Sequence, residues 1–364
     1  MNRRAILVGG GAVALASGMA GASFASMGTM QGYVHAVAAQ RAALAPHGGA
    51  REAVRFATLA ANGHNTQPWR FRIAPNVIRI VPDMARRTPV VDEDDHHLYV
   101  SLGCALENMS LAAAALGMPG EAHFEASGEG AIVYEHVAGA PRRTDLCNAI
   151  PHRQSARNEY DGRAVSAVDL TRLASAAAIP GVDIVVFSER AQIDRVRELV
   201  VAGNSAQMSD RAFVGELKTW MRFNPRAALA HGDGLFSAAS GNPTLPTWLG
   251  APLFDLVFTA GAENDKYARQ LASSSGVIVF SGRNADRRHW VDVGRSCQRF
   301  ALQATVLGMK AAFINQPVEV PALRKELAAL AGMPGRRPDL VMRFGYGPSL
   351  PMSPRRPIDA VIEA

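Results

Sequence analysis

The chain has 364 residues, 48% of them hydrophobic and 19% charged, so it is long enough to bury a substantial core and its composition is not that of a disordered protein. The formal net charge is +6, but the basic residues are scattered and form no stripe interleaved with aromatic side chains, which argues against a nucleic-acid-binding surface. Three cysteines are an odd number in a large chain and imply no disulfide framework.

The N-terminal segment differs from the rest of the chain. Arg3 and Arg4 are followed by residues 5–30, which carry no charge. A basic start before an apolar stretch is typical of an export signal, and the adjacent arginines favour the twin-arginine route to the periplasm. We therefore expect residues 1–40 to be a signal cleaved after Ala25 or Ala38. The alternative is an uncleaved anchor on the outer face of the inner membrane, because about 20 apolar residues span a bilayer.

A helix is predicted over residues 51–61, then a polar loop, then a strand over 69–80. The loop reads His-Asn-Thr-Gln-Pro-Trp from His64 to Trp69. The amides of Asn65 and Gln67 each present a donor and an acceptor, which suits the alternating N–H and C=O edge of a flavin pyrimidine ring. Pro68 fixes the backbone after the amides.

The next polar run, residues 92–97, contains side chains of the metal-ligand type. Adjacent residues in a loop rarely converge on one ion, so the run is interpreted as a solvated acidic turn, and no metal site is expected.

Residues 101–118 and 292–309 align without gaps at an offset of 191 (292 minus 101). In both stretches the apolar residues follow the 4-3-4-3 spacing of one helix face, and both end in Leu-Gly-Met. Gly117 and Gly308 suit the left-handed conformation that ends a helix. A coincidental amphipathic match would explain the apolar stripe but not the shared ending, so we expect an internal duplication.

Other predicted elements surround these two helices. Residues 224–252 are rich in glycine, proline and serine with little periodicity, and a loop of that length is either functional or disordered. Strands alternating with helices in both halves predict an α+β or α/β architecture. The remaining predicted helices cover 169–178, 191–201 and 321–330, and the remaining strands cover 182–187, 276–280 and 340–344.

Three motifs resemble those of the nitroreductase superfamily. The loop at 64–69 is similar to its N-x-Q-P-W loop, residues 153–157 are similar to its phosphate-gripping R-x-S-x-R motif, and residues 353–357 resemble its C-terminal basic segment. The resemblance implies an FMN cofactor, with a guanidinium fork and a hydroxyl on the phosphate. The implied FMN-binding residues are Asn65, Gln67, Arg153, Ser155, Arg157, Asn315, Gln316, Arg355 and Arg356.

The two halves complement each other. The first half has the amide loop but no phosphate motif ahead of it, whereas the second half has the phosphate motif but passes from Ala178 into strand without an amide loop. One composite site per chain is therefore expected. This resembles the Acg-type branch, in which one chain folds as a fused pseudo-dimer. The implied fold is α+β, nitroreductase-like and internally duplicated, with a mixed sheet flanked by helices in each lobe. The expected lobes cover 41–150 and 151–364, with a lid-like insertion at about 222–252 in a monomer.

The function implied by the resemblance is that of an FMN-dependent oxidoreductase. It would pass electrons from a small-molecule donor to a small acceptor of the nitro or quinone type. No catalytic acid or base is identified, and the segment containing Trp248 is expected to cover the flavin ring as a lid. The alternative is a protein that stores flavin without turnover, if that segment closes the substrate face altogether.

Overall fold

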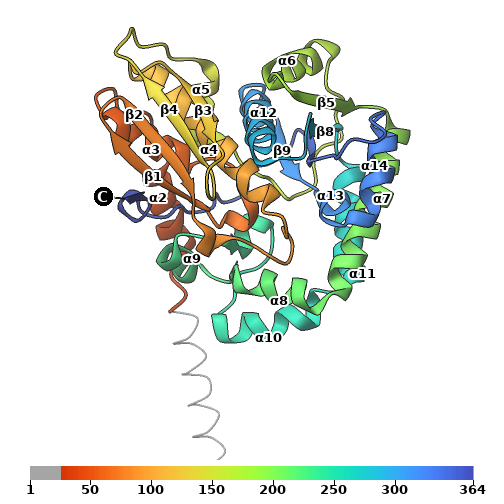
Figure 1. Cartoon of the computed structure of the whole chain (residues 1–364). Helices are drawn as coiled ribbons and strands as arrows, with labels where there is room; N and C mark the ends of the chain where they lie inside the picture. The colour runs from red at the N-terminus through yellow and green to blue at the C-terminus, as the bar shows by residue number, and fades with distance from the viewer. Residues whose placement is uncertain (1–25, 364) are drawn as a thin grey trace, which may run out of the picture.

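The computed structural model describes residues 26–363. Two sheets lie on either side of a pair of long helices, α4 (His96–Ala115) and α12 (Arg287–Val306), which pack against each other (Figure 1). The strand order is β11-β1-β2-β4-β3 in the first sheet and β5-β8-β10-β9 in the second, and β6 and β7 form a small third sheet. The α+β architecture expected from the sequence is confirmed.

The strands are β1 (Trp69–Ala74), β2 (Val77–Pro82), β3 (Gly120–Glu125), β4 (Ala131–His136), β5 (Val182–Phe187), β6 (Met221–Arg222), β7 (Leu235–Phe236), β8 (Gly276–Gly282), β9 (Lys310–Phe313), β10 (Leu340–Gly345) and β11 (Ile362–Glu363). The other α-helices are α2 (Met30–Gln40), α3 (Gly49–Thr58), α5 (Asp145–Ala149), α6 (Ala167–Ala177), α7 (Arg190–Ser209), α8 (Arg211–Thr219), α9 (Pro225–His231), α10 (Thr247–Val257), α11 (Ala260–Ala272), α13 (Gln316–Glu319) and α14 (Arg324–Leu330).

The two long helices cross at a pair of glycines. A Cβ atom added to Gly103 would lie 1.9 Å from the carbonyl oxygen of Val291, and one added to Gly294 would lie 2.0 Å from that of Val100. The two contacts correspond, because Gly294 follows Gly103 by 191 residues (294 minus 103) and Val291 follows Val100 by the same number (291 minus 100). The crossing therefore has pseudo-twofold symmetry. The helices also end alike, in left-handed glycines with φ of 78° and 73°. The internal duplication is therefore confirmed by geometry as well as by sequence.

The strand order repeats as well. Helix α3 leads into β1 in the first lobe as α6 leads into β5 in the second, and the orders β1-β2-β4-β3 and β5-β8-β10-β9 correspond position by position. The first sheet is mixed, because β11 runs parallel to β1 while its other pairs are antiparallel. In the second sheet the named strands are all antiparallel, and its β9 also makes an isolated parallel bridge from Ala311 to Ser155.

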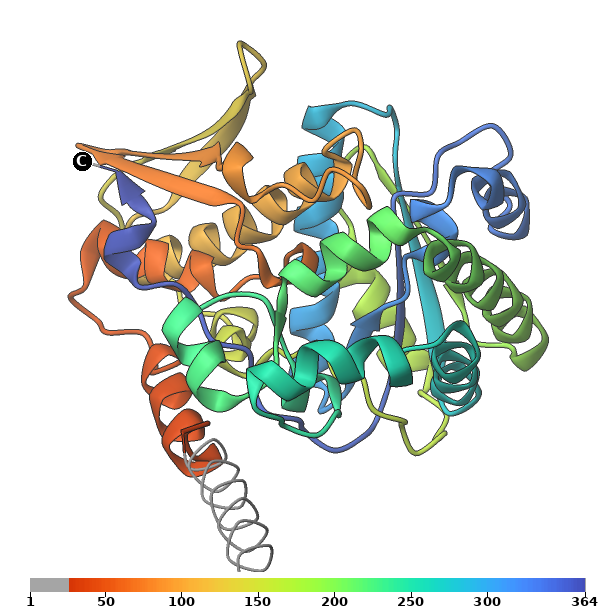
Figure 2. The ribbon, with the colours of Figure 1, turned by 90° about the horizontal axis from the view of Figure 1, so that it is seen from below.

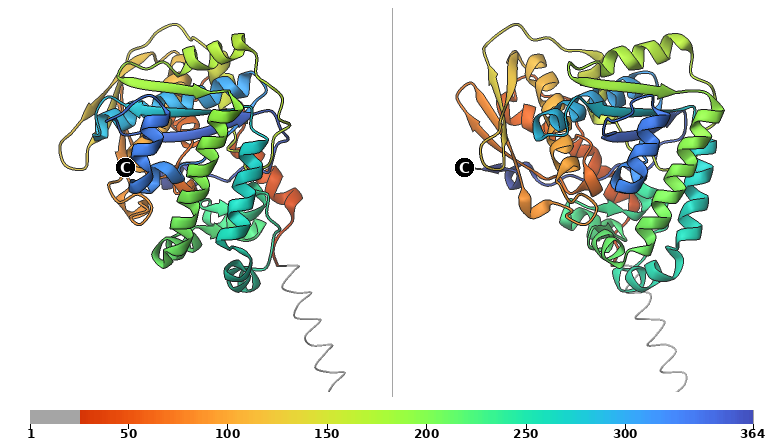
Figure 3. Two further views of the ribbon diagram at one scale, coloured as in Figure 1. Left: turned by 90° about the vertical axis from the view of Figure 1, so that its right-hand side faces the viewer. Right: turned by 45° about the vertical axis from the view of Figure 1, so that its right-hand side comes forward.

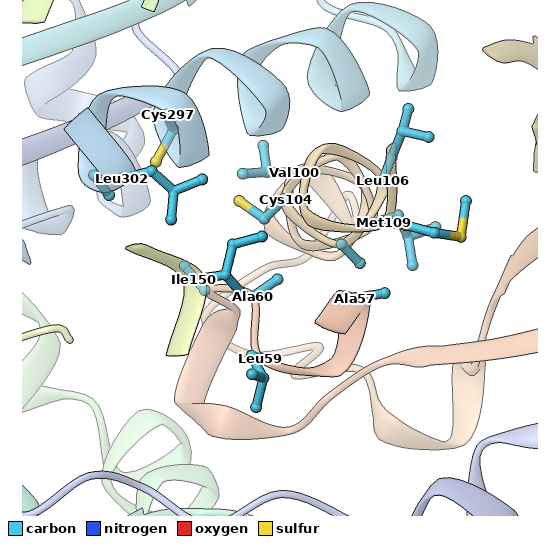
Figure 4. Close-up of a cluster of buried hydrophobic side chains, with 14 of the residues drawn as sticks. Ala57, Leu59, Ala60, Val100, Cys104, Leu106, Met109, Ile150, Cys297 and Leu302 are labelled. Carbon is cyan, nitrogen blue, oxygen red and sulfur yellow. The ribbon is translucent and has the colours of Figure 1, made fainter. Parts of the chain in front are cut away.

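The main hydrophobic core lies around the crossing helices (Figure 4). Leu106 and Met109 of α4 and Leu302 of α12 are buried there, together with Leu59 and Ile150 from the segments that bring the site residues to the centre. All three cysteines are free and buried. Of the described helices, α4 alone has the length and apolar composition to cross a membrane, and it is mostly buried within this core.

The second lobe carries a long insertion between β5 and β8. It comprises α7 to α11 and occupies the position where β1 and β2 are joined by a tight turn in the first lobe. Figure 2 shows α8, α9 and α10 crossing the lower face of the molecule beneath both lobes. The expectation of an irregular loop at 224–252 is wrong: Asn224 caps the short helix α9, Pro225 begins it and Gly232 ends it with φ of 66°. A helix of seven residues is too short to show periodicity in a sequence.

Both ends of the described chain are tied to this body. Tyr33 and Val37 of α2 are buried against the insertion, and the Tyr33 hydroxyl donates to the carbonyl oxygen of Met352 (2.7 Å). Residues 30–40 therefore pack within the folded body, and the expected signal boundary at residue 40 stays a prediction. Residues 1–25 lie outside the described part of the chain. The C-terminal residues leave the second lobe and pair with the first sheet through β11. The other expected lobe boundaries, at 41–150 and 151–364, stay predictions.

Candidate functional site

Two adjoining cavities lie where the lobes, the insertion and the C-terminal segment meet. The larger has a volume of about 200 Å³ and the smaller about 50 Å³. Ala61, Asn62, Arg157 and Leu235 line both of them, so the two form one continuous site with a wide and a narrow end. Binding sites for small molecules are typically concave and mostly apolar with a few convergent polar groups.

The loop after α3 has an unusual backbone. His64, Asn65 and Gln67 have φ of 44°, 54° and 54°, in the left-handed region that side chains other than glycine seldom adopt. The Asn62 side chain stabilises this loop by accepting a hydrogen bond from the backbone N–H of Gln67 (2.9 Å). Backbone strain of this kind concentrates at functional sites, where the surrounding structure imposes it.

The two amides of this loop bind protein partners. Asn65 donates to the carbonyl oxygen of Pro354 (3.2 Å) and accepts from the Arg355 guanidinium (2.9 Å). Gln67 is fully buried, donates to the carbonyl oxygen of Gly232 (2.8 Å) and accepts from the backbone N–H of Arg356 (2.9 Å). The loop therefore fastens the C-terminal segment and the insertion to the first lobe. Asn65 still lines the narrow cavity, whereas Gln67 lines neither cavity.

Four arginines line the narrow cavity: Arg157, which it shares with the wide cavity, and a cluster of Arg41, Arg153 and Arg355. Arg41 donates to the carbonyl oxygen of Pro151 (3.1 Å), and Arg153 donates to that of Leu59 (3.1 Å). Arg355 donates to the carbonyl oxygens of residues 58, 59 and 60 at the end of α3. Within residues 26–363, none of the three forms an ion pair with a carboxylate, and Nε of both Arg41 and Arg153 lacks a hydrogen-bond partner.

This cluster concentrates uncompensated positive charge. Burial, followed by repulsion from Arg153, lowers the pKa of Arg41 to about 9. Burial, followed by repulsion from Arg41 and Arg153, lowers the pKa of Arg355 well below its usual value. Buried charges without a partner are strongly unfavourable, so a group of three is expected only where an anion completes the site. The planar guanidinium groups of these arginines and the nearby Ser155 hydroxyl can donate several hydrogen bonds to one phosphate dianion.

Arg157 stands at the junction of the two cavities. Burial lowers its pKa, and the opposing influences come from the tyrosines Tyr267 and Tyr160. Its loop is held from behind by the fully buried Arg343, which donates to the carbonyl oxygens of Ala156 (3.1 Å) and residue 158 (2.7 Å). The junction arginine is thus positioned by backbone contacts, and its guanidinium faces the cavity without an ion-pair partner in the described chain.

The wide cavity is walled by α4 on one side and by the insertion on the other. Helix α7 packs closely against Gln316. A Cβ atom added to Gly203 of α7 would lie only 2.7 Å from the Cβ atom of Gln316. Gln316 Oε1 is buried and has no hydrogen-bond partner among the described residues, which leaves an acceptor available to a ligand N–H. Asn315 Oδ1 accepts from the backbone N–H of Val341 (2.9 Å). Phe213, Leu217, Met221, Leu235 and Phe258 supply the apolar wall of the insertion.

Three titratable groups also face the wide cavity. Burial is the first cause that lowers the pKa of His64 and of His97, each to about 4, and burial raises the pKa of Glu319. His97 Nδ1 lies 3.9 Å from Glu319 Oε1, and Glu319 also accepts from Gln207 Nε2 (2.6 Å). Both imidazoles are therefore neutral near pH 7. Sequence reasoning identified no acid or base, because these residues lie on separate elements.

The expectation of a solvated acidic turn at 92–97 holds only in part, because Glu93 and Asp94 are exposed whereas Asp92 and His96 are buried. Ligand-type atoms of Asp92, His96 and His97 lie within 4.8 Å of one another. The Asp92 carboxylate accepts from the backbone N–H groups of His97 (2.9 Å) and Leu98 (3.0 Å), and His96 Nε2 lies 3.2 Å from Asp339 Oδ1. These contacts give Asp92 and His96 a structural role at the start of α4, where the first N–H groups of a helix need acceptors. The expected absence of a metal stays a prediction.

Seven of the nine residues predicted from the sequence line the site. Gln67 and Arg356 line neither cavity. The Arg356 guanidinium instead donates to the carbonyl oxygens of Gln67 (3.3 Å) and Ala360 (2.9 Å). Trp248 is 62% exposed and lines neither cavity, whereas Leu235, Ser240 and Asn242 of the same segment line the wide cavity, so the expected role of this segment as a lid stays a prediction. The residues that line the cavities are Asn65, Arg153, Ser155, Arg157, Asn315, Gln316 and Arg355, and their role as cofactor ligands stays a prediction.

Sequence reasoning missed Arg41. Arg41 follows α2 directly and lines the narrow cavity. It is the first residue after the expected export signal, which covers residues 1–40. No motif or periodicity next to Arg41 in the sequence marks it as a ligand. Gln40 accepts from the backbone N–H of Arg355 (2.8 Å), so two segments far apart in the sequence meet at the arginine cluster.

No protein-family profile matches the chain. Two proteins of Mycobacterium tuberculosis are similar to it along most of its length. The one named NAD(P)H nitroreductase Rv3131 is 26% identical over 334 residues, covering 86% of this chain and 90% of the relative. The one named NAD(P)H nitroreductase acg is 23% identical over 333 residues, covering 85% of this chain and 94% of the relative.

Among solved structures, a nitroreductase with bound FMN from Desulfitobacterium hafniense matches 61% of this chain and 99% of its own, with a TM-score of 0.39 and 16% identity. The FMN-dependent nitroreductase NfnB from Mycobacterium smegmatis, solved with NADPH, matches 56% of this chain and 87% of its own, with a TM-score of 0.37 and 15% identity.

Proposed function

Because this chain belongs to the nitroreductase superfamily and is of the Acg type, we propose that it is an oxidoreductase that binds one FMN between its two lobes. The observation that carries the proposal is the cluster of Arg41, Arg153 and Arg355 at the narrow end of the site, buried without a carboxylate partner in the described chain. Such a cluster suits a bound dianion, and FMN carries one at the end of its ribityl chain.

The residues present fit this cofactor. The three arginines and Ser155 would hold the phosphate, and the wide cavity would take the ring, with Gln316 Oε1 as an unused acceptor for a ring N–H. Arg157 at the junction would place positive charge near the ring. The phosphate ligands come from α2, from the start of the second lobe and from the C-terminal segment, while the loop at Asn65 belongs to the first lobe. One composite site therefore draws on both lobes.

When bound, FMN supplies the hydride and electron transfer of this family. The protein binds and orients it, and the apolar wall of the insertion limits access of water to the wide cavity. His64 and His97 are neutral and face the cavity, so neither adds charge there near pH 7. We propose a nicotinamide as the electron donor, supported by the names of the two relatives, and a nitro compound or quinone as the acceptor.

The visible spectrum and redox response of the purified protein test this function. We expect one FMN per chain, bleaching of the flavin absorbance by NADPH without oxygen, and recovery on addition of a nitroaromatic or a benzoquinone. Free FMN at the same concentration is the control for uncatalysed reduction. Retained yellow colour with no bleaching by NADH or NADPH would favour flavin storage instead. A protein that binds no FMN, or two per chain, would contradict the composite site.

We propose further that the chain is exported by the twin-arginine route, which suits a protein folded around its cofactor before transport. The packing of Tyr33 and Val37 supports cleavage after Ala25 rather than after Ala38, since the latter would remove α2. If the segment is not cleaved, it remains as an anchor. Intact mass of the exported protein distinguishes the two forms, and replacing Arg3 and Arg4 with lysine should abolish export. Export that survives this change would exclude the twin-arginine route.

A further inference from the structure

The outer face of α10 exposes an unusual amount of apolar surface. Trp248, Leu256 and Val257 are 62%, 72% and 64% exposed, which are three of the four largest exposed fractions among the large hydrophobic residues of the described chain. Ala251 and Pro252 are also exposed. The opposite side of the helix is buried. We call these five residues the outer face of α10.

The inner side of α10 explains why the outer face is free. A Cβ atom on Gly250 would lie 2.5 Å from the Phe223 ring, and the Phe254 ring stacks on that of Phe258 with centroids 4.3 Å apart. Phe258 in turn lines the wide cavity. The helix therefore already has a well-packed inner side, and its outer face has no partner within the described chain.

The described chain begins beside this face. Ser26 and Met27 line a surface hollow together with Thr247 and Trp248 of α10. The carbonyl oxygen of Met27 accepts from the backbone N–H of Arg226 (2.8 Å), which fixes the start of the chain at the lower end of the molecule. Figure 3 shows α10 at this end in both views.

The sequence before this point has the composition of a membrane-spanning segment. Residues 5–25 carry no charge, and 21 residues at 1.5 Å each would extend about 30 Å as a helix, the thickness of the hydrocarbon core of a bilayer. If that segment crosses the membrane, Ser26 emerges at the headgroup level. The N-terminus of α10, which contacts the same hollow, then lies at that level too.

Resting on the uncleaved form, given above as the alternative to cleavage after Ala25, we infer that the outer face of α10 lies in the headgroup region of the membrane that holds the N-terminal segment. Tryptophan and aliphatic side chains on one side of a helix are suited to this region. Arg226 flanks the face, and a cation of this kind attracts anionic lipid. Lys218 contributes no free charge there, because it pairs with the exposed Asp255 of α10. A second copy of the chain is a weaker occupant, because a stable protein interface takes roughly 20–30 residues a side.

This placement has a consequence for substrate choice. The helix that contacts the bilayer is continuous with Phe258, which lines the wide cavity alongside Phe213 and Leu217 of α8. A single layer of helices thus separates the membrane surface from the cavity. An acceptor dissolved in the bilayer, such as a quinone with a hydrophobic tail, would reach the site without crossing the aqueous phase.

Trp248 provides the test. The uncleaved full-length holoprotein is reconstituted in vesicles of phosphatidylethanolamine and phosphatidylglycerol, with and without brominated acyl chains that quench tryptophan on contact. We expect the brominated lipid to quench the parent, the quenching to disappear in Trp248→Phe, and to persist in Trp220→Phe as the matched control. Of the four tryptophans, Trp69 and Trp290 are buried and contribute no contact with lipid.

Several results would overturn the inference. Equal quenching in the parent and Trp248→Phe would show that α10 is not at the bilayer. Protection of Trp248 from iodide before any vesicles are added would show that a second copy or the N-terminal segment covers it, and light scattering separates these two. Failure of the chain to bind vesicles, or removal of residues 1–25 in the mature protein, would exclude the anchored form. FMN binding and NADPH-dependent bleaching remain measurable in each case, so the oxidoreductase proposal is tested separately.

Discussion

Replacing Arg153 with methionine is expected to raise the Kd for FMN by between about tenfold and about 100-fold. Hydrogen bonds to charged groups are worth roughly 1.5–3 kcal/mol, and each 1.4 kcal/mol is a factor of about ten. Methionine keeps most of the side-chain volume, and the variant loses two internal hydrogen bonds, to the carbonyl oxygen of Leu59 (3.1 Å) and to the Ser155 hydroxyl (3.5 Å). Arg355 is a less clean target because its guanidinium also holds Asn65 and the end of α3.

The comparison with riboflavin makes this measurement specific. Riboflavin has the ring and the ribityl chain but no phosphate, so the parent should bind FMN much more tightly, and Arg153→Met should lose most of that preference. Fluorescence titration of the apoprotein measures both constants. Arg190→Met serves as a control, because Arg190 also donates to backbone carbonyls but lines neither cavity. An unchanged ratio of the two constants would show that the narrow cavity does not hold the phosphate.

Substituting Gly103 with alanine is expected to lower the free energy of unfolding by about 3 kcal/mol, at the upper end of the range for an overpacked core. The added methyl group would lie 1.9 Å from a carbonyl oxygen of the facing helix, and both backbones are held by the core around them. Gly294→Ala should cost about as much, since it makes the equivalent contact. The double variant should cost less than the sum, because one separation of the helices accommodates both methyl groups.

Gly215→Ala provides the matched control for this series. Gly215 lies inside α8, and no atom lies within 4 Å of a Cβ added there. Alanine should therefore stabilise by about 0.4–1 kcal/mol through helix propensity and the unfolded state. Urea denaturation of the apoprotein measures all four variants. If Gly103→Ala and Gly215→Ala change stability alike, the close crossing of α4 and α12 is wrong.

Much of the fold was predictable because periodicity is strong where burial is regular. The apolar stripes that predicted α4 and α12 are buried except for their last members, Leu116 and Leu307, which are partly buried. The predicted strand at 182–187 matches β5 in both bounds. The strand predicted at 69–80 proves to be a hairpin of β1 and β2. Its turn at Asn76, with φ of 59°, was missed because the apolar alternation continues through it. The hairpin β3–β4 was not predicted, and the short helices of the insertion leave no readable pattern.

The site was predictable where a local motif carries it and not where tertiary contacts do. Residues 153–157 present their side chains to the cavities directly from one short segment. Gln67 and Arg356 have the residue types of ligands but satisfy each other through the Gln67 side chain and the Arg356 backbone N–H (2.9 Å). Arg41 was missed for the opposite reason, since nothing near it in the sequence marks it. The sequence gives the type of each side chain, whereas its hydrogen-bond partner depends on the tertiary structure.

The C-terminal segment crosses from the second lobe to the first, so one stretch of chain completes two structures. Arg355 lines the narrow end of the cavity, and β11 forms the edge of the first sheet. Detachment of this segment would remove one of the three clustered guanidinium groups and uncover the edge of β1 together. We therefore expect any change that loosens β11 from β1 to weaken FMN binding as well.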